Sequence, residues 1–266
     1  MESICNDLKD EYSELLKIVC GINEAQWDII TPFCDWTIRD EISHLMFGDK
    51  VALFSAEEPE KFKLQAKESM EDIDKFFEEP LIYGRSITTQ SLLKEWELIS
   101  KKLVSILLKI EPKTKLPWYG PSMNARSFAT ARIMETYAHG QDIYDALGIN
   151  RKPTDRLKHV AHLGIRTFGW AFIIRKMEVP KEQVRVELKS PSSNMWCWGP
   201  EDAADIVNGT AEDFCLTVAQ RRNVLDTELR IKGDVAKKWM SIAQVFAGPP
   251  ADPPKPGEYL QHITKK

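Results

Sequence analysis

Two side chains near the middle of the chain have the types and the spacing of a metal-binding pair. Glu135 and His139 are four residues apart in the stretch 121–148, PSMNARSFATARIMETYAHGQDIYDALG. In an α-helix, such side chains start about 5 to 6 Å apart on one face, so a carboxylate and an imidazole can bind one metal ion. Pairs of this kind are most often ordinary surface pairs, and a metal site needs a third ligand.

His44 is the candidate for that third ligand. It lies in the stretch 36–54, WTIRDEISHLMFGDKVALF, which we predict to be a helix with Thr37 as its N-cap. A single histidine on such a face is most often a satisfied core residue. His44 is therefore a candidate in combination with the pair at Glu135 and His139.

Two aspartates are candidates for holding the imidazoles in place. Asp40 lies one turn before His44, and Asp142 follows His139 by three residues. An acceptor at such a position can fix the tautomer of a metal-binding imidazole. The alternative for both aspartates is a helix-terminal or surface charge.

The two stretches together resemble a known family. W-T-I-R-D-E-I-S-H-L at 36–45, followed by M-E-T-Y-A-H-G-Q-D-I at 134–143, is similar to the DinB-like metal-binding helical bundles, and more narrowly to the branch with the mycothiol-dependent maleylpyruvate isomerases. The resemblance covers about residues 1–150. It implies that His44, Glu135 and His139 ligate a divalent ion, zinc in most members with nickel or iron as alternatives, and that a low-molecular-weight thiol takes part.

Helical periodicity in the first half of the chain predicts the elements that position these residues. We expect amphipathic helices at 3–20, 36–54, 85–110 and 121–148, and a loop with a broken helical piece at 57–80. A further helix at 157–177 should cover the apolar stripe of Ile133, Tyr137 and Tyr144 on the ligand helix. Four such helices favour a four-helix bundle.

The pattern changes from residue 179 onward. Short alternating stretches predict strands at 183–188, 194–198, 204–207 and 227–234, with helices at 210–222 and 236–246. We therefore predict a mainly α protein with a bundle domain at 1–178, a smaller α+β domain at 179–248 and a tail at 249–266.

The second domain resembles sterol-carrier-protein-like domains through V-N-G-T-A-E-D-F, Q-R-R and I-K-G-D. By the resemblance to the isomerases, Arg221 or Arg222 could hold a substrate carboxylate in a bidentate grip. Adjacent arginines at a helix end are also favourable with the helix dipole alone. Lysines outnumber arginines in this chain, unlike in proteins typical of mycothiol-producing bacteria, so the thiol can be a different one or absent.

Composition excludes several classes of partner. The 266 residues carry a net charge of −4 without long blocks of one sign, so neither nucleic acid nor a membrane is expected as a partner. Five widely spaced cysteines without a CxxC motif indicate reduced thiols that mostly fill the core. We expect a cytoplasmic protein that acts on a small molecule, and a homodimer stays open.

Three hypotheses for the function follow. The first is a metal-dependent isomerase or transferase that uses a thiol and acts on a small carboxylate-containing substrate. The second is a thiol-independent metal-dependent hydrolase or lyase, because three protein ligands leave coordination positions open. The third is a non-catalytic protein that binds a metal and an apolar ligand, as the likeness to sterol carriers suggests.

Overall fold

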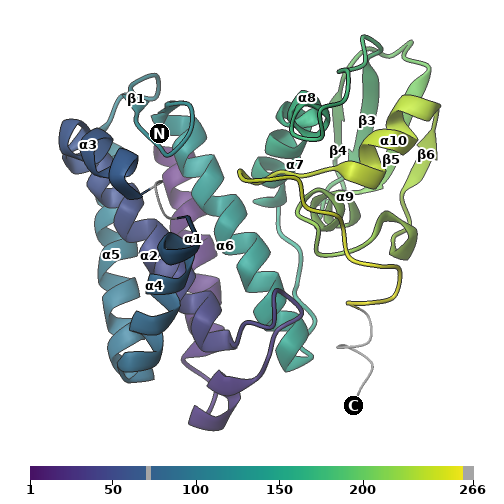
Figure 1. Cartoon of the computed structure of the whole chain (residues 1–266). Coiled ribbons are helices and arrows are strands. Elements are labelled where there is room, and N and C mark those ends of the chain that lie inside the picture. The colour runs from purple at the N-terminus through teal and green to yellow at the C-terminus, as the bar shows by residue number, and fades with distance from the viewer. Residues whose placement is uncertain (70–72, 260–266) are drawn as a thin grey trace. The chain divides into compact units, whose positions relative to one another are not determined.

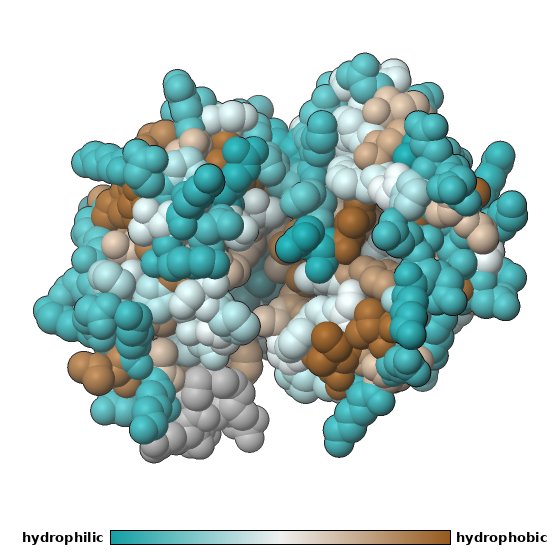
Figure 2. Space-filling view, turned by 90° about the horizontal axis from the view of Figure 1, so that it is seen from above, coloured by the Kyte–Doolittle hydropathy of each residue, from teal (hydrophilic) through white to brown (hydrophobic). Residues whose placement is uncertain are grey.

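The computed structural model describes residues 1–69 and 73–259, which form two compact units, Met1–Leu147 and Gly148–Lys266 (Figure 1). Within the described ranges, no helix is long and apolar enough to cross a membrane. Figure 2 shows hydrophilic residues over most of the surface in view, with apolar residues in separate patches. The two units are described in turn.

Four long helices form the core of the first unit and confirm the predicted bundle. They are α1 (Glu2–Val19), α2 (Ile38–Glu57), α5 (Thr89–Lys109) and α6 (Ala125–Leu147). Helices α1 and α2 each pack against both α5 and α6, which closes a ring around one core. The unit also contains a short helix, η1 (Glu24–Asp28), and a two-stranded sheet of β1 (Lys115–Leu116) and β2 (Met123–Asn124).

The segment expected to be a loop at 57–80 contains two helices, which corrects the prediction for its described residues. These are α3 (Pro59–Ser69) and α4 (Ile73–Ser86); residues 70–72 of this segment lie outside the described ranges. Pro80 lies inside α4, and its carbonyl accepts a hydrogen bond from the Ser43 hydroxyl of α2. Phe62 anchors α3 by stacking on Trp118 at 6.1 Å between ring centroids. These tertiary contacts therefore stabilise helices in a segment whose prolines and acidic residues favour a loop.

The second unit is built around a four-stranded sheet with the order β4-β3-β5-β6. The strands are β3 (Val184–Lys189), β4 (Met195–Trp198), β5 (Asp205–Thr210) and β6 (Arg230–Lys232). Its helices are α7 (Leu157–Arg166), α8 (Phe168–Ile173), α9 (Ala211–Val218), η2 (Val224–Asp226) and α10 (Asp234–Ile242). Strands β3 and β5 run parallel, whereas β4 and β6 are antiparallel to their neighbours. The smaller α+β part is thereby confirmed.

The single helix expected at 157–177 is instead the two helices α7 and α8, and both belong to the second unit. Helix α7 packs on α9 at Gly164, where a Cβ atom would come within 2.9 Å of Val218. The division of the chain after Leu147 thus differs from the expected boundary after residue 178. On its apolar side, α6 packs against α1, and the Tyr144 hydroxyl of α6 donates a hydrogen bond to Glu14 Oε1 of α1 at 3.4 Å.

The cysteines differ from the expectation that most of them fill the core. Cys5 and Cys215 are buried, but Cys20, Cys34 and Cys197 are exposed, and no disulfide links any of the five within the described residues. The exposed three lie at a helix end, in a loop and on a strand.

One buried carboxylate joins the four helices of the bundle. Asp49 of α2 accepts hydrogen bonds from the Tyr12 hydroxyl of α1 at 2.6 Å and from Trp96 Nε1 of α5 at 2.9 Å. The Arg132 guanidinium of α6 donates to it through Nε at 2.8 Å. Asp49 and Trp96 are fully buried, and Arg132 is 5% exposed. We call these four residues the Asp49 hub.

The hub predicts a large effect on stability. Asp49→Ala removes the acceptor of Tyr12 and Trp96 and leaves Arg132 buried without its carboxylate. We expect the free energy of unfolding to fall by about 3–5 kcal/mol, measured by urea denaturation. Asp10→Ala, on the exposed face of α1, is the control and should change it by less than about 0.5 kcal/mol. Equal effects of the two substitutions would contradict the hub.

Candidate metal centre

Local capping fixes where the two ligand-bearing helices begin. Thr37 caps α2 as predicted: its side chain accepts from the Asp40 N–H, and the Asp40 carboxylate accepts from the Thr37 N–H at 3.0 Å. Helix α6 begins at Ala125, where the Asn124 side chain accepts from the Ser127 N–H at 2.8 Å. These caps satisfy backbone donors that have no partner inside a helix. They also set the positions of His44 and of the pair on α6.

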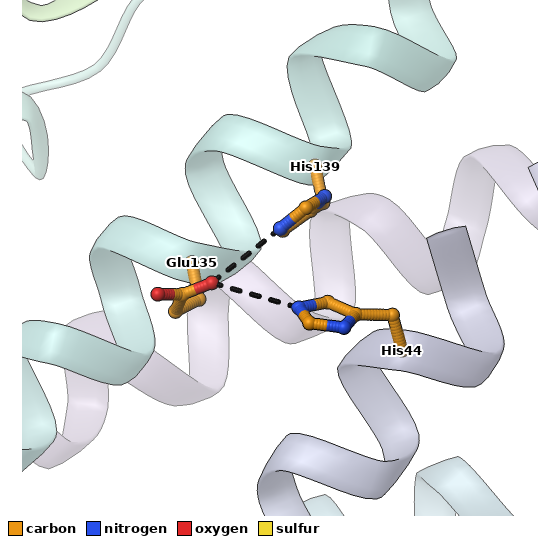
Figure 3. A group of neighbouring side chains, drawn as sticks. All are labelled: His44, Glu135 and His139. Atoms are coloured by element: carbon orange, nitrogen blue, oxygen red, sulfur yellow. Dashed lines mark ion pairs between the residues drawn. The ribbon is translucent and has the colours of Figure 1, made fainter. Parts of the chain in front are cut away.

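The structure brings His44, Glu135 and His139 together between α2 and α6 (Figure 3). Glu135 Oε2 lies 3.8 Å from His44 Nε2 and 3.4 Å from His139 Nε2. One ligand atom from each residue lies within 4.8 Å of the other two. Metal–ligand bonds of about 2.0–2.2 Å place the donor atoms of a tetrahedral ion about 3.3–3.6 Å apart. The donor set and its spacing therefore fit a divalent ion such as zinc.

The charges of this cluster suit metal binding. Burial lowers the pKa of His44, His139 lowers it further, and the Glu135 carboxylate opposes both effects. Burial alone would raise the pKa of Glu135, but the neighbouring imidazoles of His139 and His44 and the charge of Arg132 hold it well below its usual value. An ionised carboxylate beside a neutral imidazole is the combination that coordinates a metal ion.

The opposite nitrogen of His139 contacts a buried glutamate. Glu41 Oε2 lies 2.7 Å from His139 Nδ1, and Glu41 Oε1 accepts from the Thr31 hydroxyl at 2.7 Å. Glu41 is fully buried. An acceptor at Nδ1 favours the tautomer with its proton there, which leaves the Nε2 lone pair facing Glu135 and His44.

Glu41 is a residue that the sequence analysis missed. An acidic residue in the first turn of a helix is favourable with the helix dipole alone, so the position of Glu41 does not by itself indicate a functional role. However, Glu41 also falls in the apolar stripe of Ile38, Ile42 and Leu45, all of which are buried. A carboxylate inside such a stripe must be buried as well, and this was the available signal for a functional role.

The two predicted aspartates have different surroundings. Both Asp40 oxygens accept from the Arg85 guanidinium at 2.8 Å, and one also bonds Thr37. Burial opposes these bonds, but together they lower the pKa of Asp40. Asp40 therefore caps α2 and pairs with α4, and the carboxylate that contacts an imidazole is its neighbour Glu41. Asp142 is fully buried, with Oδ2 at 3.9 Å from His139 Nδ1.

Two aromatic rings from the segment before α2 pack on the imidazoles. The Trp36 ring lies 5.1 Å from His44 and 6.0 Å from His139 between centroids, nearly parallel to the latter. The Phe33 ring meets His139 edge-on at 5.2 Å. These contacts restrict the orientation of both imidazoles and shield them from water on one side.

Arg221 and Arg222 lie in the second unit, just after α9. Both are buried. Arg221 Nη1 donates to the Ala219 carbonyl at 2.8 Å, and the Arg222 guanidinium lies over the Tyr259 ring at 5.9 Å from its centroid. Their predicted contact with a substrate carboxylate stays a prediction.

The ring of helices and the cluster of two histidines and a glutamate define the chain as a DinB-like helical bundle protein. A family model described as Mycothiol maleylpyruvate isomerase N-terminal domain matches residues 8–144, just over half of the chain. The chain therefore belongs to this family, and the predicted resemblance is confirmed. A second model, described as Wyosine base formation, matches residues 180–230. The likeness of the second unit to sterol carriers stays a prediction.

The chain is also similar to individual proteins and to solved structures. Two uncharacterized proteins, from two strains of Mycobacterium tuberculosis, are 40% identical over 244 residues, which is 92% of this chain and 95% of theirs. The crystal structure of the mycothiol-dependent maleylpyruvate isomerase matches with a TM-score of 0.56 and 13% identity, over 86% of this chain and 92% of that one. A histidine-to-alanine mutant of that enzyme matches with a TM-score of 0.55 and 14% identity, over 81% of this chain and 87% of the mutant. At these identities the solved structures show the fold.

The contrast between Glu41 and Asp40 can be tested directly. Glu41→Gln removes the charge at His139 Nδ1, so we expect zinc affinity to fall about 10- to 100-fold. Asp40→Asn is the matched control, because it alters the cap of α2 and the pair with Arg85 but no contact with an imidazole. It should lower the stability of the protein and leave its zinc affinity within about twofold of that of the parent. Competition with a chromophoric chelator measures both constants. Equal affinities of the two variants would exclude the role of Glu41.

Proposed function

We propose that this protein is a metal-dependent enzyme of the thiol-dependent isomerase or transferase type, acting on a small carboxylate-containing substrate. The divalent ion, zinc in the first place with nickel or iron as alternatives, would be held by His44, Glu135 and His139. The observation that carries the proposal is the placement of these three donors around one point, with Glu135 at 3.4 and 3.8 Å from the two imidazoles.

The surroundings of the three donors favour a catalytic metal site rather than a closed structural one. The Glu135 side chain is 24% exposed and the His44 side chain 20%, so small molecules can reach this edge of the cluster. His139 is nearly buried and is held by Glu41 from behind. Three protein ligands are typical of catalytic zinc sites, which keep a position for substrate or water.

Each group would contribute a defined step. A bound divalent ion supplies the Lewis acidity that lowers the pKa of a thiol and polarises a carbonyl. Glu41 keeps the Nδ1 proton on His139, so Nε2 stays available as a ligand. Trp36 covers one side of both imidazoles and excludes water there. In this proposal Arg221 or Arg222 binds the substrate carboxylate.

The involvement of a thiol is supported by the family. The solved enzyme with the same fold is named a mycothiol-dependent isomerase. Mycothiol itself or another low-molecular-weight thiol is therefore the proposed cosubstrate, and an unsaturated or keto acid is the proposed class of substrate.

Elemental analysis is the first test of the metal. We expect about one divalent ion per chain in the purified protein and its loss in His44→Ala, Glu135→Ala and His139→Ala, because each variant leaves two of three ligands. His159→Ala, on α7 of the second unit, is the control and should retain the ion. A metal-free parent whose three variants are as stable as itself would refute the metal site.

Thiol dependence separates the proposal from its alternatives. We expect turnover of unsaturated or keto acids with added thiol. We also expect His139→Ala to lower this activity at least about 100-fold, because the ion can activate a thiol only while its ligands hold it. Equal activity in thiol-free buffer would favour a hydrolase or lyase instead. A metal-loaded protein that binds an apolar ligand and turns over no acid with any thiol would favour the binding protein.

A further inference from the structure

The Asp49 hub lies next to the candidate metal centre along both helices that supply its ligands. On α2, Asp49 follows His44 by five residues, and on α6, Arg132 precedes Glu135 by three and His139 by seven. With a rise of about 1.5 Å per residue, Asp49 is about 7.5 Å from His44 along α2, and Arg132 is about 4.5 Å from Glu135 and about 10.5 Å from His139 along α6. The ion pair of Asp49 with Arg132 therefore links the same two helices that carry the ligands, within about two turns of each ligand.

The sequence of α2 makes room for the Arg132 guanidinium. Gly48 has no side chain where the guanidinium passes: a Cβ atom there would lie 2.9 Å from both Nη1 and Nη2. Arg132 Nη2 also donates to the Leu45 carbonyl at 3.5 Å. The guanidinium thus contacts the main chain of α2 in the turn that follows His44.

This contact fixes how α6 lies against α2. A slip of α6 by one residue would move Glu135 by about 1.5 Å and rotate it by about 100°. Such a slip would also break the bond between Arg132 Nε and Asp49, while Tyr12 and Trp96 hold Asp49 from the other side. A buried ion pair of this kind specifies one register, since any other leaves a charge without its partner.

We infer that Arg132 is a positioning residue for the metal centre: through Asp49 and the space at Gly48, it sets the register at which His44 meets Glu135 and His139. The inference rests on the proposed metal site. Its consequence is that metal affinity depends on Arg132 beyond the effect of Arg132 on stability.

Two variants disturb the guanidinium in different ways. Arg132→Met keeps much of the length and the apolar volume of the side chain but removes its charge and its donors. Gly48→Ala removes no group of the hub, but its Cβ atom displaces the Arg132 guanidinium, and the substitution improves the helix propensity of α2. We expect both to weaken zinc binding by at least about 10-fold, measured by chelator competition. We also expect the visible absorption of the cobalt-loaded protein to change, since it reports coordination geometry.

Leu107→Ala is the matched control for loss of stability. Leu107 is fully buried on α5, eleven residues beyond Trp96, or about 16 Å further along the helix axis. It should lower the melting temperature without changing zinc affinity or the cobalt spectrum. Arg132→Lys should recover part of the affinity lost in Arg132→Met, because an ammonium can pair with Asp49 but lacks the planar fork.

A double variant identifies the cause of the Gly48→Ala effect. In the Arg132→Met background there is no guanidinium to displace, so Gly48→Ala should change zinc affinity by less than about twofold. An undiminished effect in that background would overturn the inference, because the methyl group would then act on the ligands directly. If Arg132→Met does not fold, the zinc affinities of Gly48→Ala and Leu107→Ala are compared instead. Equal affinities would then overturn the inference.

The possible failures can be told apart. A parent protein that binds neither zinc nor cobalt removes the proposed function and this inference with it. A parent that binds both ions, with Arg132→Met and Gly48→Ala binding as tightly as Leu107→Ala, removes only the positioning role of Arg132. The hub would then serve stability alone.

Discussion

A buried carboxylate is stable in a helical bundle only when its lone pairs are satisfied, and Asp49 meets this requirement with one donor from each of the other three helices. Apolar packing alone fixes the register of one helix against another only weakly, since leucine and isoleucine side chains can pack against many different neighbours. The hydrogen bonds of Asp49 can form in only one register of the four helices. The register of α2 against α6, and hence the meeting of His44 with Glu135 and His139, depends on this constraint.

Local patterns in the sequence contained the parts of the site, and only the resemblance to a known family predicted their assembly. Helical periodicity, the Thr37 cap and the four-residue spacing of Glu135 and His139 are local properties, and the structure confirms the cap and the helices. Which faces meet is a property of the whole bundle, which explains why Glu41 and Asp49 were missed. Each is a charged residue among apolar neighbours on α2, and only its distant partners show its role.

The incorrect expectations have the same origin. Pro80 and the acidic residues around it are genuine breaker signals, yet Phe62 and the contact from Ser43 hold helices there. Helix α7 has an apolar stripe like that of a bundle helix, and this pattern does not indicate whether the helix packs in the core of the first or of the second unit. At Gly164, the missing side chain allows α7 to approach α9 closely. Steric fit between remote segments is not encoded in periodicity.

Three carboxylates, the proposed ligand Glu135 and its neighbours Glu41 and Asp49, differ in how the fold holds them. Asp49 accepts from Tyr12, Trp96 and Arg132, groups that the fold itself fixes. Glu41 divides its oxygens between the Thr31 hydroxyl and an imidazole, so it links the fold to the site. Glu135 faces both imidazoles from the partly exposed edge. In the proposed metal site, Glu135 would bind the ion, while Asp49 and Glu41 hold the helices and His139 in place.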